Sequence, residues 1–188
     1  LNPKDTVFCL AYHSFLSSLL GEPFNSQLAP KMDNLIYHIG ESHCLSYAHR
    51  KIKIQGLDYT VVPRIIFGAK AFHFSGKINN HYKAITKANF EAIPNFSKVF
   101  ISFGEIDCRP DEGFILAVAK KKRSLEDLVS GTVKKYISWF AEQNKSKKHK
   151  IYFFNVPAPV YDKNYSDEIN TKIAITVALF NQEMKKHI

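Results

Sequence analysis

Leu35-Ile-Tyr-His-Ile-Gly-Glu-Ser-His43 is the stretch that decides how the rest of the chain folds. Residues 35–39 are almost continuously apolar, which is typical of a strand buried on both faces of a parallel sheet. A glycine and polar residues follow, as in a turn that opens a helix. Ser42 would then lie at the carboxyl end of the strand, where open α/β sheets bind their ligands. The stretch allows two roles for Ser42: a nucleophile near the positive end of the next helix, or the residue that caps that helix.

The segments on both sides of this stretch alternate between strand and helix patterns. Strands are expected over 51–55 (an edge strand), 61–67, 99–103 and 151–156, although Pro63 is unfavourable inside the second of these. Helices are expected over 43–50, 78–93, 114–119, 125–140 (opened by a capping box at Ser124) and 169–184. This alternation predicts an α/β fold with a mostly parallel sheet.

The 188 residues are enough for one domain with a sizeable core. We expect an N-terminal helix and connecting loop over 1–34, which could be the end of an upstream helical domain, and an α/β domain over 35–188. The chain begins without methionine and stops inside a helical pattern, so we expect it to be part of a longer protein.

The formal net charge is +9, and the lysines and arginines concentrate in 120–123, 145–150 and 185–186. No stacking aromatics alternate with these clusters as they do in single-strand binders, so nucleic acid is a disfavoured partner. Strand-to-helix loops of a parallel sheet share one edge, and only the 120–123 cluster is placed there to meet a substrate. The oligomeric state does not follow from the sequence.

Composition also bears on compartment and cofactors. No apolar run reaches the roughly 18 residues of a membrane span. Cys9, Cys44 and Cys108 are odd in number and lack a CxxC spacing, which disfavours disulfides and favours a reducing, cytoplasmic compartment. No pair of histidines has the spacing and carboxylate partner of a zinc site, so neither metal nor cofactor is expected. His38 is expected to pack in the core.

Three polar turns are expected at the same edge of the sheet: 40–43, 68–70 and 104–109. One carries a serine, and the last carries a glycine with carboxylates. Such a combination suggests nucleophilic attack on an acyl group, with backbone N–H groups stabilising the oxyanion.

These turns resemble the sequence blocks of the SGNH (GDSL-type) hydrolases and acetyltransferases. Gly40-Glu-Ser42 is similar to the Gly-Asp-Ser block, Gly68 to the oxyanion glycine, and Gly104-Glu-Ile-Asp107 to the Gly-x-Asn-Asp block. The resemblance spans residues 35–187 and implies a flavodoxin-like three-layer α/β/α sandwich. It also implies Ser42 as nucleophile, with oxyanion donors at Ser42, Gly68 and the Gly104 block. The activity implied is that of a serine esterase, deacetylase or O-acyltransferase for small acyl groups, on a glycan.

Two departures from the family pattern leave an alternative open. Ile106 occupies the place of the oxyanion asparagine, and the sequence contains no Asp-x-x-His block to supply the general base. Either that block lies beyond Ile188, or the domain is an inactive relative. In the second case its crevice and residues 120–123 would bind an acidic glycan or another anionic partner.

Five polar residues beside these blocks are expected to contact substrate or to shape the loops: Glu41, His43, Glu105, Asp107 and Arg109. Arg109 could hold a carboxylate or phosphate, could pair with Glu41 or Asp107, or could belong to a salt-bridged loop. His43 is a poor base for Ser42, because neighbouring residues on a helix point about 100° apart.

Overall fold

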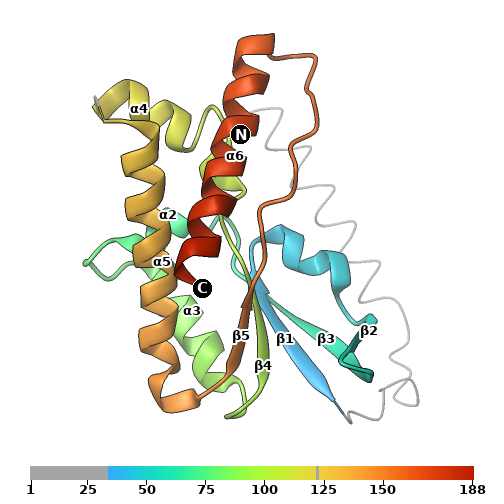
Figure 1. The fold of residues 1–188 in the computed structure, drawn as a ribbon. Coiled ribbons are helices and arrows are strands. Elements are labelled where there is room, and N and C mark those ends of the chain that lie inside the picture. The colour runs from blue at the N-terminus through green and yellow to red at the C-terminus, as the bar shows by residue number, and fades with distance from the viewer. Residues whose placement is uncertain (1–33, 122) are drawn as a thin grey trace, which may run out of the picture. The chain divides into compact units, whose positions relative to one another are not determined.

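The structure, a computed structural model, describes residues 34–188 except Lys122, and Asn34–Ile188 make up one compact unit. The helix expected near the N-terminus lies outside the described residues. The elements, in chain order, are β1 (Leu35–Gly40), the 3-10 helix η2 (Ser42–Tyr47), β2 (Lys51–Ile54), β3 (Leu57–Ile65), α2 (Ala71–Ser75), α3 (His81–Ala92), β4 (Lys98–Ser102), the 3-10 helix η3 (Ile106–Cys108), α4 (Phe114–Lys121), α5 (Leu125–Lys147), β5 (Lys150–Phe153) and α6 (Asp167–His187) (Figure 1).

The five strands form one sheet in the order β2-β3-β1-β4-β5. β1 pairs in parallel with β3 and β4, and β4 pairs in parallel with β5. Only β2, at the edge, is antiparallel to its neighbour β3. The predicted α/β class, the mostly parallel sheet and the edge strand are therefore confirmed.

Pro63 lies inside β3, where the sequence pattern made it unfavourable. The N–H groups of Thr60 and Ile66 donate to the carbonyls of Asn34 and Gly40, in the direction of β1. The backbone N–H groups of even-numbered β3 residues therefore point toward β1. The ring nitrogen of Pro63 therefore faces the opposite side. The paired residues of β2 reach only to Thr60 on that side, so the missing N–H removes no ladder hydrogen bond.

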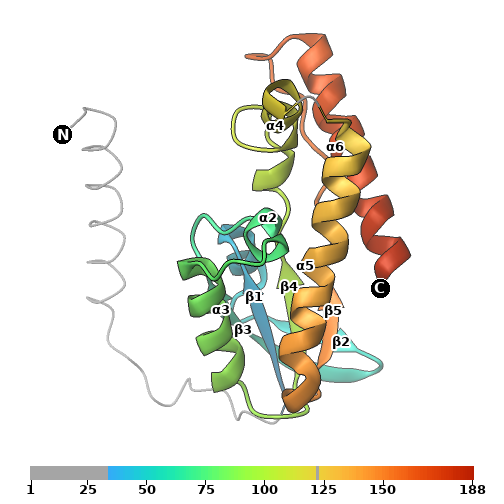
Figure 2. The same cartoon turned by 90° about the vertical axis from the view of Figure 1, so that its left-hand side faces the viewer.

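The sheet buries its two faces differently. One face packs against α2, α3, α5 and α6 (Figure 2). This larger core contains the buried rings of Phe74, Phe90, Phe103, Tyr136, Phe140 and Phe180. The other face has a small cluster, formed by Ile36, Tyr59, Val61 and Phe100. The sheet curls over it as a half-barrel, so the three-layer sandwich implied by the resemblance is not confirmed.

The predicted starts of α4 and α5 are confirmed, whereas the bounds expected for the other helices differ from those observed. Ser124 accepts a hydrogen bond from the N–H of Asp127 and caps α5, as predicted, and Ser166 caps α6 in the same way. The helix expected over 78–93 begins later, at His81, because the Asn80 side chain accepts the Lys83 N–H and caps α3. No helix of the described chain, residues 34–121 and 123–188, is long and apolar enough to cross a membrane.

Because β1, β3 and β4 are parallel, their carboxyl ends lie at the same edge of the sheet (Figure 1). The turn that opens η2, the loop after β3 and the loop that contains η3 all begin there. The three polar turns identified in the sequence are thus brought to one edge.

Candidate functional site

Ser42 is the first residue of η2, and its side chain is exposed. Glu41 occupies the N-cap position and makes no side-chain cap hydrogen bond. The interpretation of Ser42 as the helix cap is therefore wrong, because the helix begins one residue earlier than that role requires. The first N–H groups of a helix have no intrahelical acceptor, so the N–H of Ser42 is suited to bind a negative group.

Gly40 is required by the close approach of β1 to β4. A Cβ atom on Gly40 would lie 2.1 Å from Ser102 Oγ and 2.8 Å from the Ser102 carbonyl oxygen. The N–H of Glu41 donates to that same carbonyl, at 3.3 Å. Any side chain at position 40 would therefore push apart the two strands that hold the turn.

The other two glycines of the site have left-handed backbone conformations. Gly68 has φ of +67°, and Gly104 has φ of +126°. Gly68 is exposed, as an oxyanion donor needs to be. Gly104 is buried, and a Cβ there would lie 2.5 Å from Phe180 Cζ of α6, so this glycine lets α6 pack against the loop after β4.

Asp107 connects two of the loops at this edge. Its buried carboxylate accepts the N–H groups of Ala71 (2.7 Å) and Phe72 (3.0 Å) at the start of α2. Burial raises the pKa of Asp107 to about 6, while the two N–H donors oppose the rise. Asp107 therefore shapes the loop that follows Gly68.

Arg109 belongs to a salt-bridged loop. Its Nε and Nη2 donate to the Glu105 carboxylate at 3.1 and 2.8 Å, and its Nη1 donates to Glu112 Oε1 at 3.3 Å. Neither of the partners suggested by the sequence, Glu41 or Asp107, is paired with it. The guanidinium instead fixes the position of Glu105.

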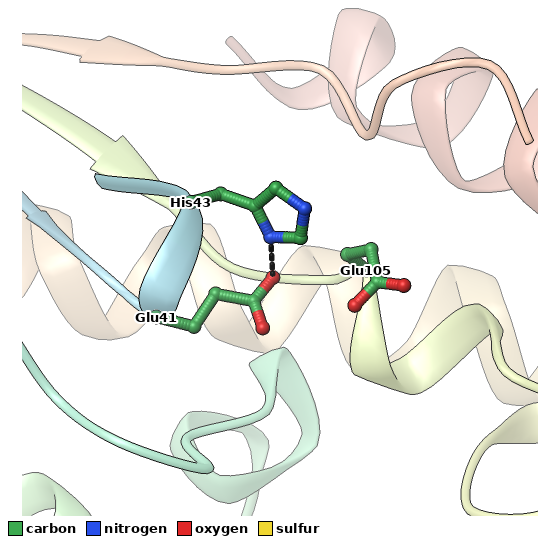
Figure 3. A group of neighbouring side chains, drawn as sticks. All are labelled: Glu41, His43 and Glu105. Carbon is green, nitrogen blue, oxygen red and sulfur yellow. Dashed lines mark ion pairs between the residues drawn. The ribbon is translucent and has the colours of Figure 1, made fainter. Parts of the chain in front are cut away.

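Glu41, His43 and Glu105 converge at the edge of the sheet, two from the start of η2 and one from the loop after β4 (Figure 3). His43 Nδ1 lies 3.3 Å from Glu41 Oε1, and one ligand atom from each of the three residues lies within 4.8 Å of the others. We call this group the Glu41–His43–Glu105 cluster. All three residues were expected near the site, but their convergence was not predicted, because the zinc criterion concerned pairs of histidines and not a histidine between carboxylates from two loops.

Glu41 is the unusual member of the cluster. It is only 3% exposed, and its Oε2 atom is buried without a hydrogen-bond partner in the described structure. Burial and, to a smaller extent, the nearby charge of Glu105 raise the pKa of Glu41 to about 7, and His43 and Arg109 oppose the rise. A carboxyl group at this position is suited to exchange a proton, or to bind a cation, near neutral pH.

A cavity of about 240 Å³ adjoins the cluster. Glu41, His43 and Glu105 line it together with apolar groups of Tyr47, Phe154 and Pro157. Ser42 is not among the lining residues, although both of its neighbours are. No lysine or arginine of the described chain lines this cavity, and its ionisable groups include the carboxylates of Glu41 and Glu105 and the imidazoles of His38 and His43.

His38 forms the inner wall of the same cavity and is a packed histidine, as predicted. It is 1% exposed, its Nε2 lies 2.9 Å from Ser102 Oγ, and its ring stacks on Phe154 with centroids 5.0 Å apart. Burial lowers the pKa of His38 to about 4, so the ring is neutral at pH 7.

The two described cysteines are not nucleophiles. Cys44 and Cys108 are buried free thiols. Burial raises the pKa of Cys44 to about 11 and raises that of Cys108 as well, so thiolate is scarce at neutral pH.

The comparisons with known proteins leave the family open. The chain matches no model of a known protein family, and no curated protein is significantly similar to it.

Proposed function

We propose that the chain is an SGNH-like serine esterase, deacetylase or O-acyltransferase for small acyl groups, with Ser42 as the nucleophile. The observation that carries the proposal is the position of Ser42. Its hydroxyl is exposed on the first residue of a helix that follows the central strand β1. Attack on an ester carbonyl there would generate an oxyanion close to N–H groups that lack intrahelical acceptors.

The loops beside Ser42 support the same activity. Exposed Gly68 follows β3, the neighbour of β1 in the sheet, and its N–H is proposed as the second oxyanion donor. The Gly104 block follows β4 on the other side of β1. The proposal includes the flavodoxin-like architecture, and the mostly parallel sheet with helices on one face is compatible with it.

The proposal places the acyl group in the cavity lined by Glu41 and His43, the neighbours of Ser42, and the cavity would then limit its size. At about 240 Å³ it is smaller than the roughly 300–1,000 Å³ of pockets for drug-sized ligands. Its apolar wall of Tyr47, Phe154 and Pro157 suits a short acyl chain, and its mouth is polar at His43. An acetyl-sized group on a larger acceptor, such as a glycan, fits this combination.

Activation of Ser42 requires a base. In the described part of the chain, no hydrogen bond joins the Ser42 hydroxyl to a histidine, and His43 is instead paired with Glu41. The proposal therefore includes a base contributed from outside residues 34–188.

Labelling with a fluorophosphonate probe, followed by intact mass, tests the proposal. The chain as printed and any longer natural form of it are treated alongside Ser42→Ala and Ser46→Ala variants. Ser46 is a matched control, because it is also an exposed serine of η2. We expect one adduct that is lost in Ser42→Ala and retained in Ser46→Ala. No adduct on folded protein, or an adduct that survives Ser42→Ala, would overturn the proposal.

A non-catalytic binding module is the second candidate, favoured by the absence of Ser42 from the cavity lining. The two carboxylates of the cavity would repel an acidic glycan. An anionic partner would instead contact exposed Lys120 and Arg123 at the end of α4. Binding of an anionic oligosaccharide that weakens in Lys120→Ala, together with a negative labelling result, would support this candidate.

A further inference from the structure

The Glu41–His43–Glu105 cluster has the donor atoms of a metal site. Imidazole nitrogen together with carboxylate oxygen is a ligand set for zinc and neighbouring transition metals, whereas Mg²⁺ and Ca²⁺ favour oxygen alone. The 3.3 Å separation of His43 Nδ1 and Glu41 Oε1 is close to that of two ligands about 2.0–2.1 Å from one ion in tetrahedral geometry. All three ligand atoms lie within 4.8 Å of one another, and an ion bound between them would draw the third ligand closer.

A second observation points to a ligand at this position. Glu41 is only 3% exposed and lines the cavity. Its Oε2 atom has no hydrogen-bond partner in the described structure. A buried carboxylate oxygen without a hydrogen bond destabilises the fold, because nothing compensates the loss of its hydration. A cation bound to both oxygens of Glu41 would compensate this cost and would also reduce the repulsion between the two carboxylates.

We propose that Glu41, His43 and Glu105 bind a divalent transition-metal ion of the zinc type at the mouth of the 240 Å³ cavity. Three protein ligands leave at least one coordination position open toward the cavity, as in zinc sites that bind water or substrate. The metal proposal does not depend on Ser42 as the nucleophile, since a serine hydrolase mechanism requires no metal.

Arg109 positions one ligand of this site. Its Nε donates to both oxygens of Glu105 and its Nη2 donates to Oε2, which leaves Oε1 with a further lone pair for an ion. An outer residue that hydrogen-bonds a metal ligand fixes the ligand's orientation and is commonly worth about 10–100-fold in affinity. Arg109 competes electrostatically with the ion, but it also prevents Glu105 from turning away from the cluster.

Isothermal titration calorimetry with Zn²⁺, on protein first stripped with a chelator, tests the proposal. We expect one Zn²⁺ per chain, with affinity lowered about tenfold or more in Glu41→Gln and in His43→Ala. His187→Ala is the matched control, because His187 also lies beside a buried glutamate, Glu183, with Nε2–Oε2 at 3.9 Å, but has no third ligand. This variant should bind as the wild type does.

Thermal unfolding without metal shows that each variant is folded, so loss of binding is attributable to loss of a ligand. Absence of Zn²⁺ binding by the wild type, or unchanged affinity in Glu41→Gln and His43→Ala, would overturn the proposal. Equal affinity for Mg²⁺ would overturn the transition-metal assignment, since it would show that the imidazole is not a ligand. Ser42→Ala should bind Zn²⁺ normally, which separates this result from that of the labelling experiment.

Discussion

Replacing Glu41 with glutamine should abolish a loss of folding stability that the wild-type chain shows as the pH rises. The pKa of Glu41 is about 7 in the folded chain, against an ordinary value of 4.5. Between these two values the folded protein retains a proton that the unfolded chain has released. Its free energy of unfolding therefore falls as the pH rises from about 4.5 to about 7, and stays lower above that range.

The magnitude follows from the size of the shift. At about 1.4 kcal/mol per pKa unit, ionising Glu41 in the folded state costs roughly 3 kcal/mol. Glutamine has nearly the same shape and cannot ionise. We expect Glu41→Gln and wild type to have similar stability near pH 4.5, and the variant to be more stable by up to roughly 3 kcal/mol at pH 8.

Urea unfolding at a series of pH values, with a chelator present so that no cation stabilises the ionised carboxylate, measures this difference. Subtracting the two curves removes the contributions of other groups, including His38 and Asp107, whose pKa values are also shifted. Glu142→Gln, at an exposed carboxylate, is the control and should show no such pH dependence. A wild-type chain that gains stability relative to Glu41→Gln as the pH rises would refute the reasoning.

Three further outcomes are expected. Asp107→Asn should lower the free energy of unfolding, measured in urea, by about 1–3 kcal/mol, because the single amide oxygen can accept only one of the two N–H groups at the start of α2. An unchanged unfolding midpoint would contradict these two hydrogen bonds. Gly40→Ala should destabilise by about 1–3 kcal/mol or more, because its Cβ would lie 2.1 Å from Ser102 Oγ, and a thermal melt equal to wild type would show that the strands can separate freely. The His38 ring should remain neutral in NMR titrations from pH 8 to about pH 5, since burial lowers its pKa to about 4; protonation near pH 6.5 would mean that water reaches the ring.

Patterns within single segments determined the secondary structure. The apolar run of β1, the helical stripes of α5 and α6, and the serine that caps α5 are local features, and each is confirmed. They also predicted that the polar turns share one edge, because that follows from parallel strands whatever their order. The sequence did not predict α2, because a helix of five residues is too short to have a periodic pattern.

Only the tertiary structure shows which contacts the residues of these turns make. Asp107 and the start of α2 meet because β3 and β4 lie on either side of β1. Arg109 pairs with Glu105, and not with Glu41 or Asp107, because of the geometry of the loop after β4. The sequence by itself determined which residue types reach the edge of the sheet. Which of them become buried, unpartnered or paired, as in the Glu41–His43–Glu105 cluster, depended on contacts between residues far apart in the chain, and these set the solvation and charge environment of each group.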